Sequence, residues 1–204
     1  MRVATGHLRA QDPVLARLVD RHGPPPVRRP VRSDRRFESL AEAIVYQQLA
    51  GRAAATIHGR FVAALDGSVT PETVLASSDE LLASCGLSRA KAASIRDLAG
   101  HVADGRLALE RIGRLSDDEV VTHLTQVRGI GPWTAQMFLL GTLGRLDVWP
   151  TGDYGVRAGF GRAWGLDGIP SVQELTELGE PFRPYRSLVA WYCWRVVDDR
   201  SGEE

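Results

Sequence analysis

Two short stretches of the chain hold the residues whose types and spacing could do chemistry. "RGIGPW" places two glycines and a proline between two stretches of helical pattern, and "PTGDYGVR" places Asp153 directly after a tight turn. Glycines at 129 and 131 permit backbone angles that are closed to other residues, and the proline suits the first position of a new helix. Because the N–H groups at a helix start carry partial positive charge, this turn is expected to bind a phosphate group without any cationic side chain.

Each of these features also has a plainer interpretation. An aspartate before a helical stretch is typical of an N-cap residue, whose carboxylate accepts a hydrogen bond from the first helical turn. The alternative is that Asp153 lies at the mouth of a cleft near the glycine turn. A Gly-x-Gly sequence also occurs in ordinary turns between antiparallel helices, so neither feature defines a function by itself.

The elements that must position these residues are helices. Apolar residues recur with helical spacing through residues 37–50 and 54–65, and almost nothing in the chain alternates with period two. The first pattern predicts a helix with Phe37, Ile44 and Gln48 on one face. Capping boxes, in which a glutamate follows three residues after a serine, predict helix starts at Ser77, Ser116 and Ser171. We therefore expect an all-α fold of about ten short helices.

These helices are expected to form one folded unit over residues 1–204, built from two lobes with the ligand site in the cleft between them. The first lobe spans approximately residues 37–142 and includes a helix–hairpin–helix at 117–142. The second lobe combines residues 1–36 with 143–204 and carries Asp153.

Composition excludes several classes of protein. The 204 residues are 44% hydrophobic, but no stretch approaches the ~20 apolar residues of a membrane span, and the N-terminus lacks the apolar run of a signal peptide. A cytoplasmic protein that does not contact a membrane is therefore expected. The two cysteines stand far apart and the five histidines share no ligand spacing, so we predict no iron–sulfur cluster and no catalytic metal.

The formal net charge of zero hides an uneven distribution of charge. Residues 1–36 contain nine arginines, at positions 2, 9, 17, 21, 28, 29, 32, 35 and 36. Such a segment either follows a phosphate backbone or is solvated surface, and the sequence leaves both interpretations open. Of the 25 cationic side chains only Lys91 is a lysine.

Several motifs together resemble one known family. They are "FESLAEAIVYQQLAGRAAATI", "GLSRAKAASIRDLA", "VRGIGPWTAQMFLL", "GDYGVR" and "RPYRSLVAWYCWRVVD", which cover most of the chain. With the hairpin followed by an aspartate, the sequence resembles the helix–hairpin–helix (HhH-GPD) DNA glycosylases. It is most similar to the DNA-3-methyladenine glycosylase II group, in a compact form without the N-terminal β domain of larger relatives.

The resemblance implies base excision repair of double-stranded DNA that contains a damaged base. An alkylated purine such as 3-methyladenine or 7-methylguanine would be flipped from the duplex and released by hydrolysis. Asp153 would stabilise the oxocarbenium-like transition state and orient or deprotonate the attacking water. Bifunctional glycosylase/lyases of the family carry a nucleophilic lysine at the position of Trp133, so the resemblance implies a monofunctional enzyme here.

The resemblance also assigns the remaining site residues. The base pocket would be lined by Trp133, Met137, Trp194 and Tyr46, the last of which stands where relatives carry a small residue. Gln48 would fill the gap left by the flipped base. The DNA backbone would be bound at Gly129, Ile130, Gly131 and Thr134, and carbonyls of Thr125, Val127 and Ile130 would hold a structural Na⁺ or K⁺. No other cofactor is expected, and the protein is expected to be a nucleoid-associated monomer.

Core packing competes with several of these assignments. Trp191, Tyr192 and Trp194 share one "WYCWR" helix, so at least one of them is expected to face the interior. An exposed glutamine at a helix end would look the same as Gln48. Two other functions also remain open: a monofunctional glycosylase for hypoxanthine, ethenoadenine or uracil, and a non-catalytic helix–hairpin–helix DNA-binding protein. A carboxylate near the phosphates argues against the second, because it would weaken DNA affinity.

Overall fold

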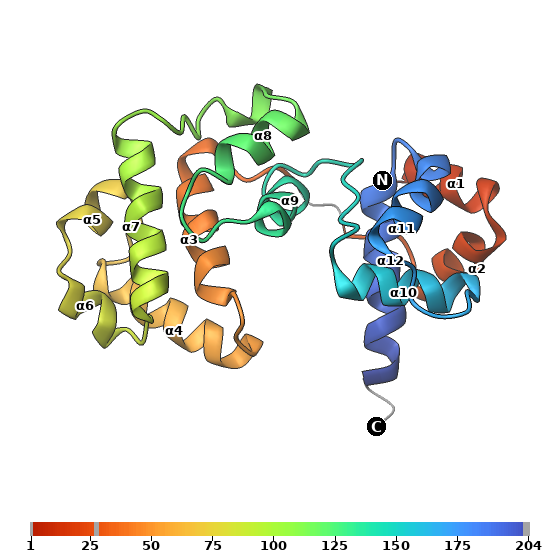
Figure 1. Ribbon diagram of the computed structural model, residues 1–204, viewed down its shortest axis with the longest axis horizontal. Helices are drawn as coiled ribbons and strands as arrows, with labels where there is room; N and C mark the ends of the chain where they lie inside the picture. Colours follow the sequence, from red (N-terminus) through yellow and green to blue (C-terminus); the bar gives the residue numbers. More distant parts are fainter. Residues whose placement is uncertain (1, 27–28, 202–204) are drawn as a thin grey trace. The chain divides into compact units, whose positions relative to one another are not determined.

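The structure is a computed structural model that describes residues 2–26 and 29–201. All regular elements of this described part are helical, namely twelve α-helices and three short 3₁₀ helices (Figure 1). The predicted all-α fold is confirmed. None of the described helices is both long and apolar enough to cross a membrane.

The chain forms two compact units. One, the hairpin unit, is Pro30–Leu143, and the other, the aspartate unit, combines Met1–Arg29 with Gly144–Glu204. Residues 30–36 and Leu143, which the sequence analysis assigned to the second lobe, therefore belong to the hairpin unit. The reason lies in two contacts, because Val31 N–H donates to the Thr142 carbonyl at 2.8 Å and Arg36 Nη1 donates to the Leu109 carbonyl at 2.7 Å.

The hairpin unit is built around α7 and α3. Its elements in chain order are η1 (Ser33–Arg35), α3 (Arg36–Tyr46), α4 (Gly51–Ala64), α5 (Pro71–Ala76), α6 (Asp79–Ser84), α7 (Arg89–Ala103), η2 (Ile112–Arg114), α8 (Asp117–Leu124) and α9 (Pro132–Gly141). Helix α7 packs against α3, α5 and α6, and α9 packs against α3 and α8 (Figure 1). The core between them is apolar, with Leu40, Phe61 and Leu98 fully buried.

Two of the three helix starts predicted from serine–glutamate pairs are confirmed. Ser116 and Ser171 each form the predicted capping box with the glutamate three residues later. The prediction at Ser77 is wrong by one residue, because Ser78 caps α6 by accepting from Leu81 N–H while Ser77 ends α5.

The predicted helix over residues 37–50 ends early. Helix α3 stops at Tyr46, and Gln48 adopts φ 55°, a left-handed conformation that a helix does not contain. Gln48 is therefore exposed in the α3–α4 loop and does not continue the buried face formed by Phe37 and Ile44.

The aspartate unit contains α1 (Arg2–Gln11), α2 (Pro13–His22), α10 (Tyr154–Trp164), α11 (Val172–Gly179), η3 (Glu180–Phe182) and α12 (Arg186–Ser201). Helices α10 and α12 cross closely. A Cβ placed on Gly159 of α10 would overlap the backbone of Cys193 in α12, so only glycine allows this approach. The crossing brings the start of α10, where Asp153 lies, beside the middle of α12.

Candidate functional site

Gly129 is required by the chain's own conformation. It lies between α8 and α9 with φ 78°, and an added Cβ would overlap Oγ of Ser94 on α7 and lie 3.1 Å from Cβ of Ser94. The predicted need for a residue without a side chain is thus confirmed at position 129. Both predicted helices of the hairpin are present on either side of this turn.

Gly131 has a different environment, and the prediction about its backbone is wrong. Its φ of −94° and ψ of 175° are open to other residues, and an added Cβ would meet no protein atom within 4 Å. Neither conformation nor internal packing therefore explains this glycine. Its bare backbone instead leaves open surface at the start of α9.

Thr134 contributes to the hairpin through its backbone. Its side chain is buried and accepts a hydrogen bond from Nε2 of Gln47 at 3.2 Å, so the predicted DNA contact can involve only its N–H. Gly131, the N-cap residue of α9, supplies no side-chain hydrogen bond to the first turn. The helix start therefore presents N–H groups that have no acceptor within the helix.

The turn that precedes α9 is supported from inside the hairpin unit. Oδ2 of Asp97 accepts the Arg128 N–H at 2.7 Å, and Nε2 of Gln47 donates to the Gly129 carbonyl at 2.9 Å. Of the three carbonyls predicted to hold a monovalent cation, that of Val127 accepts the Ile130 N–H at 3.1 Å. Ile130 itself is buried, so its side chain anchors the turn.

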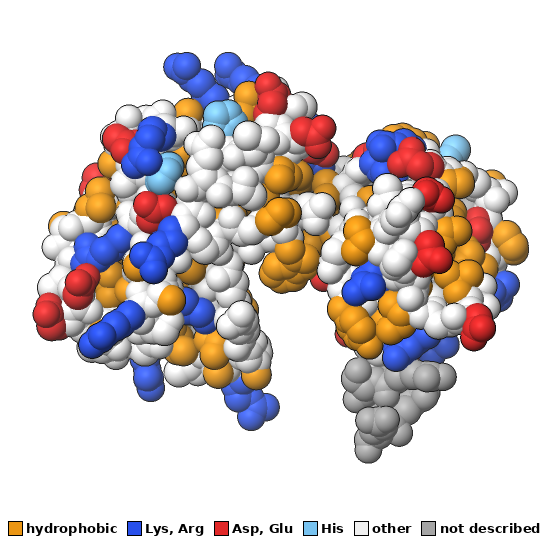
Figure 2. Space-filling view, in the orientation of Figure 1, with side chains coloured by type: hydrophobic (Ala, Val, Ile, Leu, Met, Phe, Trp, Pro, Cys, Tyr) orange, Lys and Arg blue, Asp and Glu red, His pale blue; other side chains and the backbone are white. Residues whose placement is uncertain are grey.

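Two of the predicted pocket residues share one face of α9. Trp133 is 47% exposed, and Met137, one turn later, is half-buried. Figure 2 shows hydrophobic side chains at the surface over this helix. Tyr46, at the end of α3, is also exposed, but its ring packs edge-on against His58 at 6.2 Å between centroids. The hairpin unit thus presents the exposed aromatic side chain of Trp133 two residues after Gly131 of the glycine turn.

Asp153 is an N-cap residue, as one of its two interpretations predicts. Its Oδ1 accepts the Val156 N–H at 2.8 Å and the indole N–H of Trp194 at 3.0 Å. Two donors on one oxygen fix the orientation of the carboxylate. This geometry is compatible with the second interpretation, because a cap holds the charge in place without removing it.

Trp194, which was predicted to line the base pocket, therefore contacts Asp153 through its indole N–H. Tyr192 is the residue of this group that packs inside, as predicted, since it is fully buried and its hydroxyl donates to the Gly23 carbonyl at 2.9 Å. Burial raises the pKa of Tyr192 to about 12. Burial and the nearby charge of Asp153 raise the pKa of the Cys193 thiol, so this cysteine remains neutral.

The structure gives roles to two residues that the sequence analysis did not assign. Nε2 of Gln47 donates to the hairpin as described above, and Nζ of Lys91 donates to the Gln47 carbonyl at 2.8 Å. The doubled glutamine in "YQQLA" was the only available signal for Gln47, and the isolation of Lys91 as the single lysine was the only one for Lys91.

Many of the N-terminal arginines are already paired within the protein. Arg9 pairs with Asp20, Arg21 with Asp199, Arg32 with Asp34 and Arg35 with Glu38. Arg28 lies outside the described residues. These pairs favour solvated surface over a phosphate-binding role for that part of the chain.

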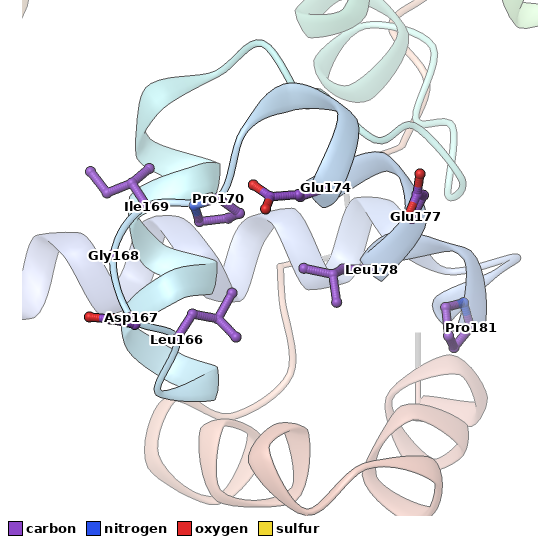
Figure 3. A pocket seen from close by; sticks show the side chains of 9 residues that line it. All are labelled: Leu166, Asp167, Gly168, Ile169, Pro170, Glu174, Glu177, Leu178 and Pro181. Carbon is purple, nitrogen blue, oxygen red and sulfur yellow. The ribbon is translucent and has the colours of Figure 1, made fainter.

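The described residues include no cluster of three or more His, Cys, Asp or Glu side chains able to hold a metal ion. Cys85 and Cys193 are both buried free thiols. A shallow pocket of about 580 Å³ does lie in the aspartate unit, between the α10–α11 loop and α11 (Figure 3). Its lining includes the carboxylates of Asp167, Glu174 and Glu177, which would repel a phosphate, and it lies beyond the end of α10 opposite to Asp153.

Helix α8, the glycine turn and α9 together form a helix–hairpin–helix. Residues 41–184 match the family model described as HhH-GPD superfamily base excision DNA repair protein. The chain belongs to this superfamily, and both the predicted family and the predicted fold class are confirmed.

Relatives agree with this assignment over nearly the full chain. DNA-3-methyladenine glycosylase 1 of Schizosaccharomyces pombe is 33% identical over 193 residues, which cover 93% of this chain and 85% of the relative. The structure of S. pombe 3-methyladenine DNA glycosylase (Mag1) in complex with abasic DNA matches with a TM-score of 0.83 at 33% identity, covering 94% of this chain and 95% of that one. DNA-3-methyladenine glycosidase from Bacillus halodurans matches with the same TM-score and identity, covering 96% and 89%.

Proposed function

We propose that this chain is a monofunctional DNA glycosylase that flips alkylated purines of the 3-methyladenine and 7-methylguanine type out of duplex DNA and releases them by hydrolysis. The observation that carries the proposal is the fixed orientation of the Asp153 carboxylate. Asp153 lies within the "GDYGVR" motif, and its Oδ1 accepts hydrogen bonds from the Val156 N–H and from the indole of Trp194 on α12. The names of its relatives support the same substrate class.

A single carboxylate is sufficient for this chemistry. An alkylated purine carries positive charge and leaves the sugar as a neutral base, so little acid catalysis is needed. As the bond between C1′ and the base nitrogen breaks, positive charge develops on the sugar, and the carboxylate of Asp153 stabilises it electrostatically. Water then bonds to C1′ and gives up a proton, which Asp153 or solvent accepts.

The partner is double-stranded DNA, and the hairpin is its proposed phosphate-binding element. The N–H groups at the start of α9 favour a negative charge, and the bare backbone of Gly131 allows a phosphate to approach closely. The S. pombe relative was solved with abasic DNA, which supports this role. A Na⁺ or K⁺ at the carbonyls of Thr125, Val127 and Ile130 belongs to the same proposal.

Trp133 supports both the substrate class and the monofunctional reaction. Its exposed indole is suited to stacking on a cationic base, and Met137 extends the same apolar face. An indole cannot form a Schiff base with the sugar. Lys91 is the only lysine of the chain, and its Nζ already donates to two backbone carbonyls. We further propose a monomer without other cofactors, acting at the nucleoid in the cytoplasm.

The test is base release from a panel of duplexes, read by chromatography. The panel contains 3-methyladenine, 7-methylguanine, ethenoadenine, hypoxanthine and uracil, and borohydride is added in a parallel series to trap any covalent intermediate. We expect release of alkylpurines and no trapped adduct. Release of uracil without alkylpurines would move the substrate assignment to another lesion, and binding of an abasic duplex without any release would identify a DNA-binding protein. Efficient trapping would show that an amine of the chain attacks the sugar.

A further inference from the structure

The loop that carries Gln48 has a backbone conformation that requires support. Gln48 has φ 55°, in the left-handed region that L-residues other than asparagine and aspartate rarely adopt. Its side chain is exposed. Because a strained, exposed residue persists only when its neighbours hold it, the contacts on either side of Gln48 show what fixes this loop.

The first support is Lys91. Its Nζ donates to the Val45 carbonyl at 2.7 Å and to the Gln47 carbonyl at 2.8 Å, so the ammonium group occupies the end of α3. A cation at this position satisfies carbonyls that have no partner within the helix and complements the helix dipole. Burial lowers the pKa of Lys91, which is the cost of placing an ammonium group there.

The second support is the side chain of Gln47. Its amide Nε2 donates to the Gly129 carbonyl at 2.9 Å and to Oγ1 of Thr134 at 3.2 Å. Gly129 lies in the turn of the hairpin, and Thr134 lies in the first turn of α9. The residue that precedes Gln48 is therefore bonded directly to the proposed phosphate-binding element.

Helix α7 supports both loops from one face. Lys91, Ser94 and Asp97 follow one another at intervals of three residues along it, and such residues are neighbours on a helix surface. Lys91 holds the α3–α4 loop, Ser94 packs against Gly129, and Asp97 accepts the Arg128 N–H. One rigid helix thus fixes the positions of Gln48 and of the hairpin relative to each other.

We propose that Gln47 and Lys91 are positioning residues that hold Gln48 in register with the hairpin, so that a phosphate bound at α9 places Gln48 opposite the base to be flipped. The inference rests on the proposed function and on the role that the family resemblance implies for Gln48, which is to fill the gap left by that base. The inference identifies Gln47 and Lys91 as the residues that determine the position at which the Gln48 side chain enters the duplex. Neither residue contacts the reacting atoms, so both act through Gln48.

The test is a double-mutant cycle in the full-length protein. Gln47→Leu removes the amide donor of Gln47 and keeps most of the side-chain volume. This substitution is introduced both into the parent protein and into the Gln48→Ala variant. The two measurements are single-turnover release of 3-methyladenine and the fluorescence rise of 2-aminopurine placed beside the lesion, which reports unstacking. Gln173→Leu, an exposed position on α11, is the matched control.

We expect Gln47→Leu to lower both base release and the fluorescence rise by about tenfold in the parent, on the scale of losing a hydrogen-bonded support. In Gln48→Ala the same substitution is expected to have a clearly smaller effect, limited to the loss of its hydrogen bonds to the hairpin, because the residue it positions is already absent. Equal effects in both backgrounds would overturn the proposal, since they would indicate a general structural role.

Substitutions of Lys91 test the second support independently, with the same two measurements. Lys91→Met removes the donor, whereas Lys91→Arg keeps a cation that can reach the carbonyls, so activity is expected to be lost with methionine and largely rescued with arginine. Equal activity of the two variants would overturn the role of Lys91.

If Gln48→Ala itself leaves the fluorescence rise at the parental level while base release continues, the positioning proposal fails and the glycosylase proposal stands. Absence of release from any lesion in the parent, with the fluorescence cycle intact, would count against the glycosylase proposal alone.

Discussion

The indole N–H of Trp194 donates to Oδ1 of Asp153 at 3.0 Å, the same oxygen that caps α10. The aspartate unit contains a second pair of this kind. Asp12 caps α2, and the indole N–H of Trp164 donates to Oδ2 of Asp12 at 3.1 Å. The two pairs differ in one respect, because the cap of α2 uses Oδ1 of Asp12 and the indole uses Oδ2, whereas Oδ1 of Asp153 accepts both donors.

Asp153→Asn is expected to lower the rate of base release by roughly 10²-fold or more, the scale of removing one aligned electrostatic stabiliser. Asparagine caps a helix about as well as aspartate, so folding stability and binding of an abasic duplex should remain near parental. Asp12→Asn removes a capping charge at the other pair and should leave the rate of base release by the folded protein unchanged, although its amide NH2 faces the Trp164 N–H and should lower the thermal midpoint. The comparison uses single-turnover rates and thermal unfolding of both variants. Parental release by Asp153→Asn would leave Asp153 as a helix cap only.

Trp194→Phe separates stacking from orientation of the carboxylate. Phenylalanine keeps an aromatic ring but cannot donate to Asp153, so kcat is expected to fall by about tenfold through loss of a hydrogen bond to a charged group. Trp191→Phe, three residues earlier on α12, is the control because the Trp191 ring packs on Tyr192 and Arg195. If Trp194→Phe retains parental kcat while Trp194→Leu loses activity, stacking is the important contribution of this side chain.

Acid stability is expected to depend on the capping glutamates. Hydrogen bonds from the hydroxyl and N–H of Ser116 lower the pKa of Glu119. Because the folded-state pKa lies below the unfolded one, this contribution is present above the unfolded value and is lost as pH falls through the folded value. Glutamine also completes a capping box, so Glu119→Gln should flatten the decline of the thermal midpoint between about pH 5 and pH 3. Superimposable pH profiles of parent and variant would contradict this expectation.

Patterns that are local in sequence predicted much of this protein. Helical periodicity predicted the all-α fold, the serine–glutamate pairs predicted two of the three capping boxes, and the "GIGP" turn predicted the hairpin. These features depend on residues within a few positions of one another, so the physical chemistry of the segment decides them.

Features that depend on distant residues were not predictable in this way. The periodicity of residues 37–50 gave no sign that α3 stops at Tyr46, because Lys91, which satisfies the carbonyls at its end, lies more than forty residues away in sequence. The two glycines of the hairpin looked alike, yet only Gly129 packs against Ser94 of α7. Tertiary contacts decided both outcomes.

The strain at Gln48 yields a prediction about stability. Gln48→Ala and Gln48→Gly both remove the side chain, but only glycine adopts φ 55° without steric cost, so the glycine variant should be more stable by roughly 1 kcal/mol. The measurement is the free energy of unfolding in urea. Asp66, at φ 52° in the α4–α5 turn, is the comparison, and Asp66→Gly should likewise exceed Asp66→Ala in stability. Equal stability of the two Gln48 variants would show that the loop relaxes to another conformation once the glutamine is absent.

The two hairpin glycines should respond to alanine differently in stability, although both substitutions should weaken DNA binding. Gly129→Ala places a Cβ against Ser94 at a φ of 78°, so it should lower the thermal midpoint and weaken DNA binding together. Gly131→Ala meets no protein atom, so its thermal midpoint should stay near parental while affinity for an abasic duplex falls, because the new methyl group occupies the surface that a phosphate approaches. Fluorescence anisotropy at several salt concentrations gives the affinities, and the salt dependence of the parent should be shallow because backbone amides replace cationic side chains at this contact. Parental affinity of Gly131→Ala would mean that the start of α9 is not in contact with DNA, and the exposed arginines would then be the next residues to substitute.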